Sequence, residues 1–445
     1  MKGDFTRDTF DPRNHYTRVF MQQGRVQVDA DWNEQASIAQ RYLRVFVTDV
    51  VGQHGGPAGD GGFQIAVSDA GDLTVGVGRY YVQGLLCENE NKIGYTEQPS
   101  YPFEPTLEEL RRASGFLLYL DVWERHVSYL EAPGLREVAL GGPDTATRSQ
   151  LVWQVRALLG AGEIFTCAAT EEFLACGSGL MRAKGREPEP APDACVIDPE
   201  ARYRGAENQL YRVEIHRGGP ACREYASSGA TFKWSRENGS VAFPILQQWR
   251  DNRGSVVLTL GSVGRDARLG LKEGDWVELS DDATALAFAS PPLLQVASVD
   301  RDEFEVVLTG ATHDGVGTQP DLHPVLRRWD HDAASEFEGA LPVRESSGDD
   351  GWIDLEDGIR IQFATGEGPE REYRTGDYWL VPARTATGDV EWPWSIGSAP
   401  DALPPRGVVH HYAPLAEMAV DDRVFTVTTD CRRLFAPLEN VNGPA

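Results

Sequence analysis

Positive charge is scarce in this chain of 445 residues. Lys and Arg number 42 against 68 Asp and Glu, so the formal net charge is -26 at pH 7 and the sequence pI is near 4.7. Nucleic acids and anionic membranes bind basic surfaces and are repelled by acidic ones. The composition therefore excludes nucleic acid and membrane as expected partners, whereas the repulsion between like charges favours solubility.

Long apolar stretches are also lacking. No run reaches the roughly 18 residues of a membrane-spanning helix. The first residues, Met1-Lys2-Gly3-Asp4, are not followed by the apolar segment of a secretory signal peptide. We therefore expect synthesis in the cytoplasm, for a protein that either remains in the cell or becomes part of a released or cell-associated particle.

Cysteine is infrequent, and its spacing gives no metal-binding pair. There is no C-x-x-C, and the closest two of the six cysteines are nine residues apart (176 minus 167): Cys87, Cys167, Cys176, Cys195, Cys222 and Cys431. Cysteines of a cytoplasmic protein are mostly reduced and buried. We expect thiols here rather than a disulfide framework or a zinc site.

The motifs of common cofactor and catalytic sites are incomplete. The glycine-rich segment 52–62 reads as a flexible loop, without the Gly-Lys-Ser/Thr ending of a P-loop or the strand and helix of a dinucleotide site. Segment 177–179, Gly-Ser-Gly, lacks the framing of a nucleophile elbow. We therefore expect no cofactor and no catalytic residue in these segments.

Metal-binding patterns are incomplete as well. Segment 29–33, Asp-Ala-Asp-Trp-Asn, copies the first ligands of an EF-hand loop, but Glu34 and Gln40 stand where the loop needs a glycine and a bidentate carboxylate. His410 and His411 are adjacent, so in a strand their side chains point to opposite faces. We expect no bound metal.

One group of carboxylates comes closer to a site. Two carboxylates a few ångströms apart are what a glycosidase needs, and tryptophans can form sugar-binding platforms. Acidic residues of turns are more often solvated, however, and tryptophans of β-rich domains are more often core. The acidic group is Asp349, Asp350, Asp354, Glu356 and Asp357, and the tryptophans include Trp234, Trp276, Trp329, Trp352, Trp379, Trp392 and Trp394.

The strongest local folding signal lies between Phe20 and Val51. Alternation of polar and Val residues over 25–29 predicts a half-buried strand after the turn at Gly24. Asp31 with Glu34 three residues on has the form of a capping box. It predicts a helix over 32–51 that stops at Gly52.

This predicted helix has two stripes of different character. Ser37, Arg41, Arg44 and Thr48 form a polar stripe. The apolar stripe is Trp32, Ala36, Ala39, Leu43, Phe46 and Val50, widened by Ile38, Tyr42, Val45 and Val47. Such a helix is either enclosed by its own chain or packed against another subunit. For the second case, the candidate docking and oligomerisation residues are Trp32, Ala39, Leu43, Phe46 and Val50.

The rest of the chain is expected to form strands. Tyr16–Phe20 begins the series, Thr106 with Glu109 caps one short helix, and Asn238-Gly239 and Asp357-Gly358 have the turn residues of β-hairpins. Short apolar runs at 256–260, 274–279, 293–299 and 304–308 predict a small barrel of the SH3 or OB type.

These elements predict a mainly β protein with an N-terminal α-helix and several domains of β-sandwich and small β-barrel type. The expected domains are an N-terminal strand-helix docking module at 1–62, a β-rich domain at 63–182, a Pro-rich linker at 183–203, a barrel-like domain at 204–320 and a C-terminal β-rich domain at 321–445.

The N-terminal sequence resembles a known family. Lys2-Gly3-Asp4-Phe5-Thr6-Arg7-Asp8-Thr9-Phe10-Asp11-Pro12, followed by Gln22-Gln23-Gly24-Arg25-Val26-Gln27-Val28-Asp29-Ala30-Asp31-Trp32-Asn33-Glu34-Gln35, is similar to uncharacterised bacterial proteins that accompany phage-tail-like contractile injection systems. The resemblance implies a structural protein at the baseplate or fibre end of such a particle, with protein partners and a homo-oligomeric state.

Three functional hypotheses follow. A non-enzymatic assembly component agrees with the resemblance and with the scattered reactive groups. A glycan-binding or glycan-cleaving protein would use the acidic group and exposed tryptophans, with a glycan as its partner. An effector carried as cargo by the particle would show toxic activity when expressed alone in a target cell.

Overall fold

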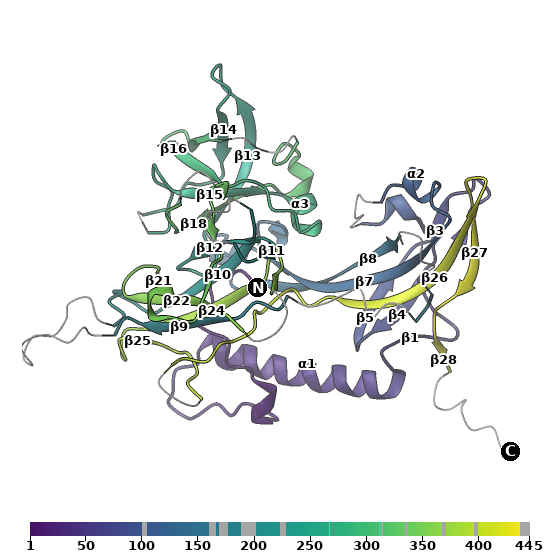
Figure 1. The fold of residues 1–445 in the computed structure, drawn as a ribbon, viewed down its shortest axis with the longest axis horizontal. Helices are drawn as coiled ribbons and strands as arrows, with labels where there is room; N and C mark the ends of the chain where they lie inside the picture. The colour runs from purple at the N-terminus through teal and green to yellow at the C-terminus, as the bar shows by residue number, and fades with distance from the viewer. Residues whose placement is uncertain are drawn as a thin grey trace, which may run out of the picture. The chain divides into compact units, whose positions relative to one another are not determined.

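The computed structural model is a mainly β protein with one long helix, α1 (Asp29–Val51), as the sequence predicts (Figure 1). It describes residues 1–99, 105–159, 166–168, 177–187, 202–222, 228–266, 268–310, 312, 315–333, 337–366, 371–395 and 399–436. The shorter helices are α2 (Leu107–Leu110) and α3 (Asp282–Leu286), with single 3-10 turns at Pro12–Asn14, Tyr95–Glu97, Pro133–Leu135, Val138–Leu140, Pro320–Leu322 and Asp349–Gly351. No helix in the described part of the chain combines the length and apolar character needed to cross a membrane.

The chain divides into two compact units, each assembled from separate segments. Unit 1 contains Met1–Asp8, His126–Arg148 and Cys176–Gly407, and unit 2 contains Thr9–Arg125, Ser149–Ala175 and Val408–Ala445. The chain therefore enters each unit more than once. The contiguous domain limits expected from the sequence stay predictions.

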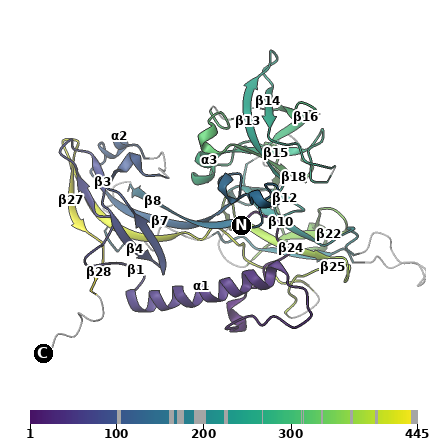
Figure 2. The ribbon, with the colours of Figure 1, turned by 180° about the vertical axis from the view of Figure 1, so that it is seen from behind.

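Unit 2 contains α1 and three sheets. The longest strands pair in the order β27-β26-β7-β8, as labelled in Figure 1 and seen from behind in Figure 2. Their bounds are β7 (Gly115–Val127), β8 (Arg148–Leu158), β26 (His411–Asp421) and β27 (Val424–Asp430). The second sheet has β28 (Leu434–Phe435), β1 (His54–Pro57), β4 (Gly78–Val82) and β5 (Leu85–Asn89), and the third has β2 (Ile65–Val67), β3 (Leu73–Val75) and β6 (Ile93–Gly94). Their core includes Phe63, Tyr80, Leu118 and Phe425.

Unit 1 contains a five-stranded sheet in the order β19-β12-β10-β24-β25. Its strands are β10 (Gln209–Arg217), β12 (Thr231–Ser235), β19 (Leu341–Pro342), β24 (Tyr378–Arg384) and β25 (Asp389–Val390). Smaller pairings join β9 (Met181–Gly185), β20 (Glu345–Ser346), β21 (Ile353–Asp354) and β22 (Ile359–Ala364), and β11 (Gly219–Pro220) with β23 (Glu372–Tyr373). Trp234, Phe363 and Trp379 lie in the core between these strands.

A closed barrel of six strands completes unit 1. The four strands that the sequence predicts are confirmed as β14 (Val256–Leu260), β15 (Trp276–Ser280), β16 (Leu294–Asp300) and β17 (Glu305–Thr309). Closure needs two more, β13 (Ala242–Arg250) and β18 (Val325–Trp329), which pair with each other. Apolar side chains of all six strands fill the interior, as expected for a barrel of this size.

The structure corrects the start of α1. Tyr16–Phe20 and residues 25–28 are not strands, and Val26 is 88% exposed. The helix begins at Asp29, three residues before the predicted start, and its N-cap, Val28, has no side-chain capping bond. Asp31 therefore lies inside the first turn, where its charge is favourable at the positive end of the helix dipole. The predicted stop at Gly52 is confirmed, with a positive φ of 96°.

Two glycine-containing segments also differ from expectation. Segment 52–62 is not only a loop, because His54–Pro57 forms β1 between β4 and β28. Asn238 and Gly239 adopt the expected positive φ values of 49° and 65°. The flanking strands do not form a hairpin, however, since β12 pairs with β10 and β19 whereas β13 belongs to the barrel. The turn leads from one sheet to the next.

Other local predictions are confirmed. Asp357-Gly358 connects β21 with β22 in an antiparallel pair, and Thr106 caps α2 through a capping box. The Pro-rich linker at 183–203 is corrected at its start, where residues 183–185 complete β9, while its residues 188–201 lie outside the described part of the chain.

Candidate functional site: the exposed face of helix α1

The polar stripe of α1 contacts its own unit. Gly84 has a φ of +77° in the turn between β4 and β5, and a Cβ atom there would lie 2.5 Å from the carbonyl oxygen of Arg44. Only glycine fits that approach. The Arg44 guanidinium forms an ion pair with Glu124 of β7. The sequence therefore directs the polar side of the helix, not its apolar side, toward unit 2.

The first half of α1 is held by the arm that precedes it. The Thr9 hydroxyl donates a hydrogen bond of 2.5 Å to Glu34, and the backbone N–H of Val19 donates one of 2.9 Å to the side-chain oxygen of Gln35. Glu34 thus bonds to the arm rather than back to a helix cap. Together with Arg44, these contacts fix the rotation of the helix about its axis.

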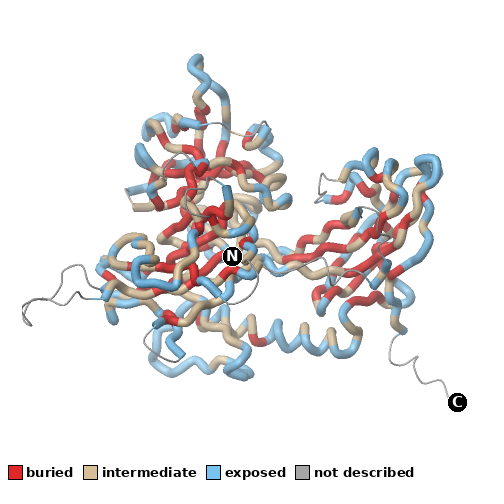
Figure 3. Tube along the Cα trace, viewed as in Figure 1, coloured by how far each residue is buried: buried red, intermediate tan, exposed pale blue. Residues whose placement is uncertain are grey.

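Most of α1 is exposed (Figure 3), and this includes six residues of the apolar stripe, although Ile38 at its margin is buried. We call these six residues the α1 seam: Trp32, Ala36, Ala39, Leu43, Phe46 and Val50. Trp32 is 72% exposed and Phe46 57% exposed. Of the two sequence-based alternatives, enclosure by unit 2 is therefore wrong for these six residues. All five predicted docking residues lie in the seam.

The exposed apolar surface is concentrated in this part of the chain. Eleven of the 25 exposed large hydrophobic residues of the described chain fall between Tyr16 and Val50. Contiguous exposed apolar surface on a folded protein marks a site of interaction. The seam residues recur at spacings of four and three, the 3.5-residue period of helices that pair along a common line. The geometry suits a second helix.

A cavity beside the start of α1 is small. Its volume is about 160 Å³, and it is lined by the arm residues Val19, Phe20, Met21, Gln22, Arg25, Val26 and Gln27 together with Asp31. Sites for drug-sized molecules typically measure about 300–1,000 Å³. The exposed helix face, rather than this cavity, is therefore the candidate site.

The acidic group is distributed among separate contacts. Asp354 forms an ion pair of 2.6 Å with Arg360, whereas Glu356 accepts hydrogen bonds of 2.9 Å from both Tyr211 and Arg236. Burial raises the pKa of Glu356, although Arg236 opposes that shift. Asp349 and Asp350 are exposed in a 3-10 turn, and Asp357, with a φ of 48°, forms the turn before β22. These contacts agree with the turn and surface roles weighed for this group.

The tryptophans are mostly structural. Buried ones are Trp234, Trp276, Trp329, Trp379 and Trp392. Trp352 is half-buried and Trp394 is 48% exposed. The core interpretation is confirmed for the five buried residues.

The adjacent histidines have different partners. His410 lies 2.6 Å from Asp121, through Nδ1, whereas His411 contacts Gln83 at 2.7 Å. Burial lowers the pKa of His411 and so favours its neutral form. The two rings are thus held by separate side chains.

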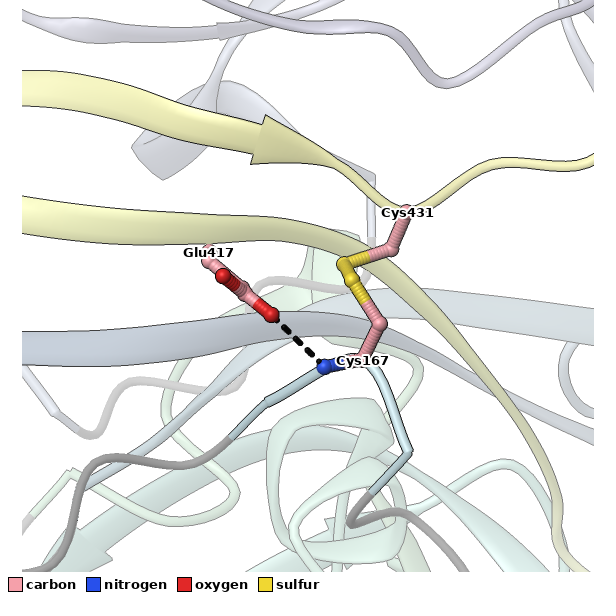
Figure 4. Close-up of side chains that lie close together, drawn as sticks. All are labelled: Cys167, Glu417 and Cys431. Carbon is pink, nitrogen blue, oxygen red and sulfur yellow. Dashed lines mark hydrogen bonds between the residues drawn. A yellow bond between two sulfur atoms is a disulfide. The ribbon is translucent and has the colours of Figure 1, made fainter.

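Two cysteines contradict the expectation of thiols. Cys167 and Cys431 form a disulfide across 264 residues of sequence (Figure 4). Glu417 lies beside it and accepts a hydrogen bond of 2.9 Å from the Cys167 backbone N–H. Among the described residues, these three form the one group with metal-ligand atoms close together, but their sulfurs are bonded to each other. Cys87 and Cys222 are buried free thiols, and Cys176 and Cys195 lie outside the described residues.

Sequence reasoning missed a buried charge network in unit 1. Lys2 contacts Glu214 at 2.9 Å, Lys233 contacts Glu278 at 2.8 Å, and Arg212 contacts Glu214 at 2.5 Å. Burial alone would raise the pKa of Glu278, but Lys233 and Lys2 outweigh it and lower that pKa to about 2. The polar positions of β10 and β12 alternate with apolar ones, which is typical of a solvent-facing side. Their partners outside these two strands are Lys2 of the N-terminal segment and Glu278 of β15, so no local signal in the sequence marks the network.

Comparison with known proteins gives one match. The model of a family described as "Family of unknown function (DUF6519)" matches residues 1–168 and 165–438. No match was found among curated proteins or among solved structures.

Proposed function

The chain belongs to the family of unknown function DUF6519, and we propose that it is a non-enzymatic assembly component that binds other proteins through the α1 seam. In line with the resemblance of its N-terminal sequence, the assembly is a phage-tail-like contractile injection particle, at its baseplate or fibre end. The observation that carries the proposal is the outward rotation of α1, which exposes its apolar stripe and turns its polar stripe toward unit 2.

The cost of this exposure supports a binding role. Each large apolar side chain left in water forgoes about 1.5–3 kcal/mol of burial free energy. Trp32, Leu43 and Phe46 are all more than half exposed. Gly84 and Glu124 stabilise the rotation that leaves them so. A partner that covers the seam would recover this free energy.

The acidic surface is compatible with such a role. The net charge of -26 disfavours association through most of the surface. The six seam residues carry no charge. Association would therefore be confined to the uncharged stripe, which gives it specificity. A glycan-binding or glycan-cleaving role has less support, because the described tryptophans are mainly buried and the acidic group is held by separate contacts.

Particle isolation tests the proposal. We expect the tagged full-length chain, expressed in its bacterial host, to sediment with tail-sheath and tail-tube proteins. Leu43→Glu places a charge in the centre of the seam and should shift the chain to the unassembled fraction, at least tenfold depleted from particles, since interface hot spots carry about 2 kcal/mol or more.

Arg41→Glu is the matched control. Arg41 is exposed on the side of α1 opposite to the seam, so this variant should sediment like the wild type. Circular dichroism of both variants checks that they fold. A wild-type chain recovered without tail proteins, or equal sedimentation of the Leu43→Glu variant, would contradict the proposal.

A further inference from the structure

We propose that the α1 seam binds the α1 seam of a second copy of this chain. The two helices form an antiparallel pair whose two-fold axis passes between the seams at the level of residue 41 along the helix. The inference rests on the proposed function and identifies a second copy of the chain as the protein that binds the seam. It follows from the order of large and small side chains along the seam, together with their exposure and lack of charge.

The side chains on the two sides of position 41 are complementary in size. In an antiparallel pair with this axis, facing positions have numbers that add to 82, so Trp32 faces Val50, Ala36 faces Phe46, and Ala39 faces Leu43. Each layer thus combines a larger with a smaller side chain. Alternating large and small residues across facing positions is what fills the space between two elements without voids or overlaps.

The parallel arrangement fits less well. There each residue would face its own copy, which sets Trp32 against Trp32 and Phe46 against Phe46, while Ala36 and Ala39 would face further alanines. Bulky layers would push the helices apart, and the alanine layers between them would leave voids, which cost stability. Antiparallel helices also align their dipoles favourably.

The exposed area is sufficient for a weak dimer. The seam spans 18 residue steps from Trp32 to Val50, or about 27 Å at 1.5 Å per residue. Trp32 is 72% exposed, Phe46 57%, Leu43 59% and Val50 53%. Aromatic side chains bury about 150–250 Å² each when fully covered, and these side chains are only partly exposed. The seam therefore supplies less than the roughly 800 Å² that one partner contributes to a standard interface, which is the range of weak, transient interfaces. We expect a dissociation constant in the micromolar range.

Electrostatics permit this pairing and predict its salt dependence. The seam is uncharged, and its flanking residue Asp49 would face Gln35 of the second copy, which lies on the same side of the seam and is not another carboxylate. Repulsion between two chains of net charge -26 remains, but salt screens it over about 8 Å at physiological ionic strength. The dimer should therefore strengthen as salt is added.

Mass measurement tests the dimer. Analytical ultracentrifugation of the full chain at up to about 100 µM, a range that brackets micromolar affinity, should show a shift from 49.0 kDa toward twice that mass. Leu43→Glu should raise the dissociation constant by about 30-fold or more, since a central hot spot contributes about 2 kcal/mol. Arg41→Glu should dimerise like the wild type. A wild-type chain that stays monomeric overturns the inference.

Cross-linking tests the orientation. Chains carrying Ala36→Cys mixed with chains carrying Phe46→Cys should form a disulfide between these positions, identified by peptide mass mapping. Each variant alone should not form this disulfide. In the antiparallel arrangement the two copies of the substituted position are about 15 Å apart along the helix axis, which is ten residues at 1.5 Å each and beyond the reach of a disulfide. Self-cross-linking of the Ala36→Cys variant alone would indicate a parallel pair and overturn the proposed geometry.

Failure of this inference can be told apart from failure of the proposed function. A monomeric chain whose Leu43→Glu variant is still lost from particles would overturn the homodimer but retain the seam as a site for another protein. A dimeric wild-type chain that never sediments with tail proteins would support the homodimer and contradict the particle assignment.

Discussion

Single charged residues in the interior of unit 1 determine how its stability depends on pH. Glu278 accepts from Lys233 at 2.8 Å and from the indole N–H of Trp329 at 3.0 Å. Lys233 also lies 4.4 Å from the centre of the Trp329 ring. Because burial would otherwise penalise the carboxylate, its cationic neighbours are what keep it ionised, and they lower its pKa to about 2.

Glu278→Gln should lower the stability of unit 1 at pH 7. Removing one partner of a buried ion pair leaves uncompensated charge, at a cost of about 3–5 kcal/mol. The folded pKa of Glu278, about 2, lies below the unfolded value of about 4.3. Its contribution is therefore present above pH 4.3 and is lost as the pH falls toward 2. Urea unfolding at pH 7 and pH 3 should show the deficit shrinking at the lower pH.

The exposed Glu273 supplies the control for that measurement. Glu273→Gln, five positions away on the outside of the barrel, should change stability by less than about 0.5 kcal/mol, as surface substitutions usually do. A Glu278→Gln deficit that is the same at pH 7 and pH 3 would show that the lost charge is not its source.

At the level of elements, the disulfide joins the end of β27 to the segment at Cys167. Reducing the Cys167–Cys431 bond should lower the unfolding free energy of unit 2 by about 2–4 kcal/mol, because the open chain has more unfolded conformations to lose. Thermal unfolding with and without dithiothreitol measures the effect. The double variant Cys167→Ser and Cys431→Ser should be as unstable as the reduced wild type and should not respond to reductant; equal midpoints for oxidised and reduced wild type would contradict the prediction.

In unit 2, the sequence predicts the apolar stripe of α1, but it predicts neither the rotation of that helix nor the disulfide. The apolar stripe of α1 was evident from its spacing, because helical periodicity is a local property. Its outward rotation was not, since it depends on the φ of Gly84 and on Glu124 of β7, far away in sequence. The pairing of two cysteines 264 residues apart has no local signal either.

For the whole molecule, turns and strand segments were predicted more successfully than their pairing. Asp357-Gly358 joins a hairpin and Asn238-Gly239 does not, although both have positive φ values. The difference lies in the partners that β12 and β13 find elsewhere in unit 1. Strand pairing at long range obeys the global packing of hydrophobic faces, which a single turn does not reveal.

The barrel shows the same distinction and allows a test. The sequence-based limit at residue 320 falls before β18, which pairs with both β13 and β15 and so closes the barrel. A fragment of residues 240–332 contains all six strands. A fragment of residues 240–320 lacks β18, so that β13 and β15 have unpaired edges and the core cluster of Val277 and Leu326 is opened to water. We expect cooperative unfolding by circular dichroism for the longer fragment only.

The comparison is informative because the fragments differ by twelve residues (332 minus 320) that include the β18 strand Val325–Trp329. A third fragment, 240–332 with Leu326→Asp, keeps the length but places a charge at a fully buried position, and should behave like the shorter one, since an unpaired buried carboxylate is strongly destabilising. Cooperative folding of 240–320 would mean that the barrel does not depend on closure by β18.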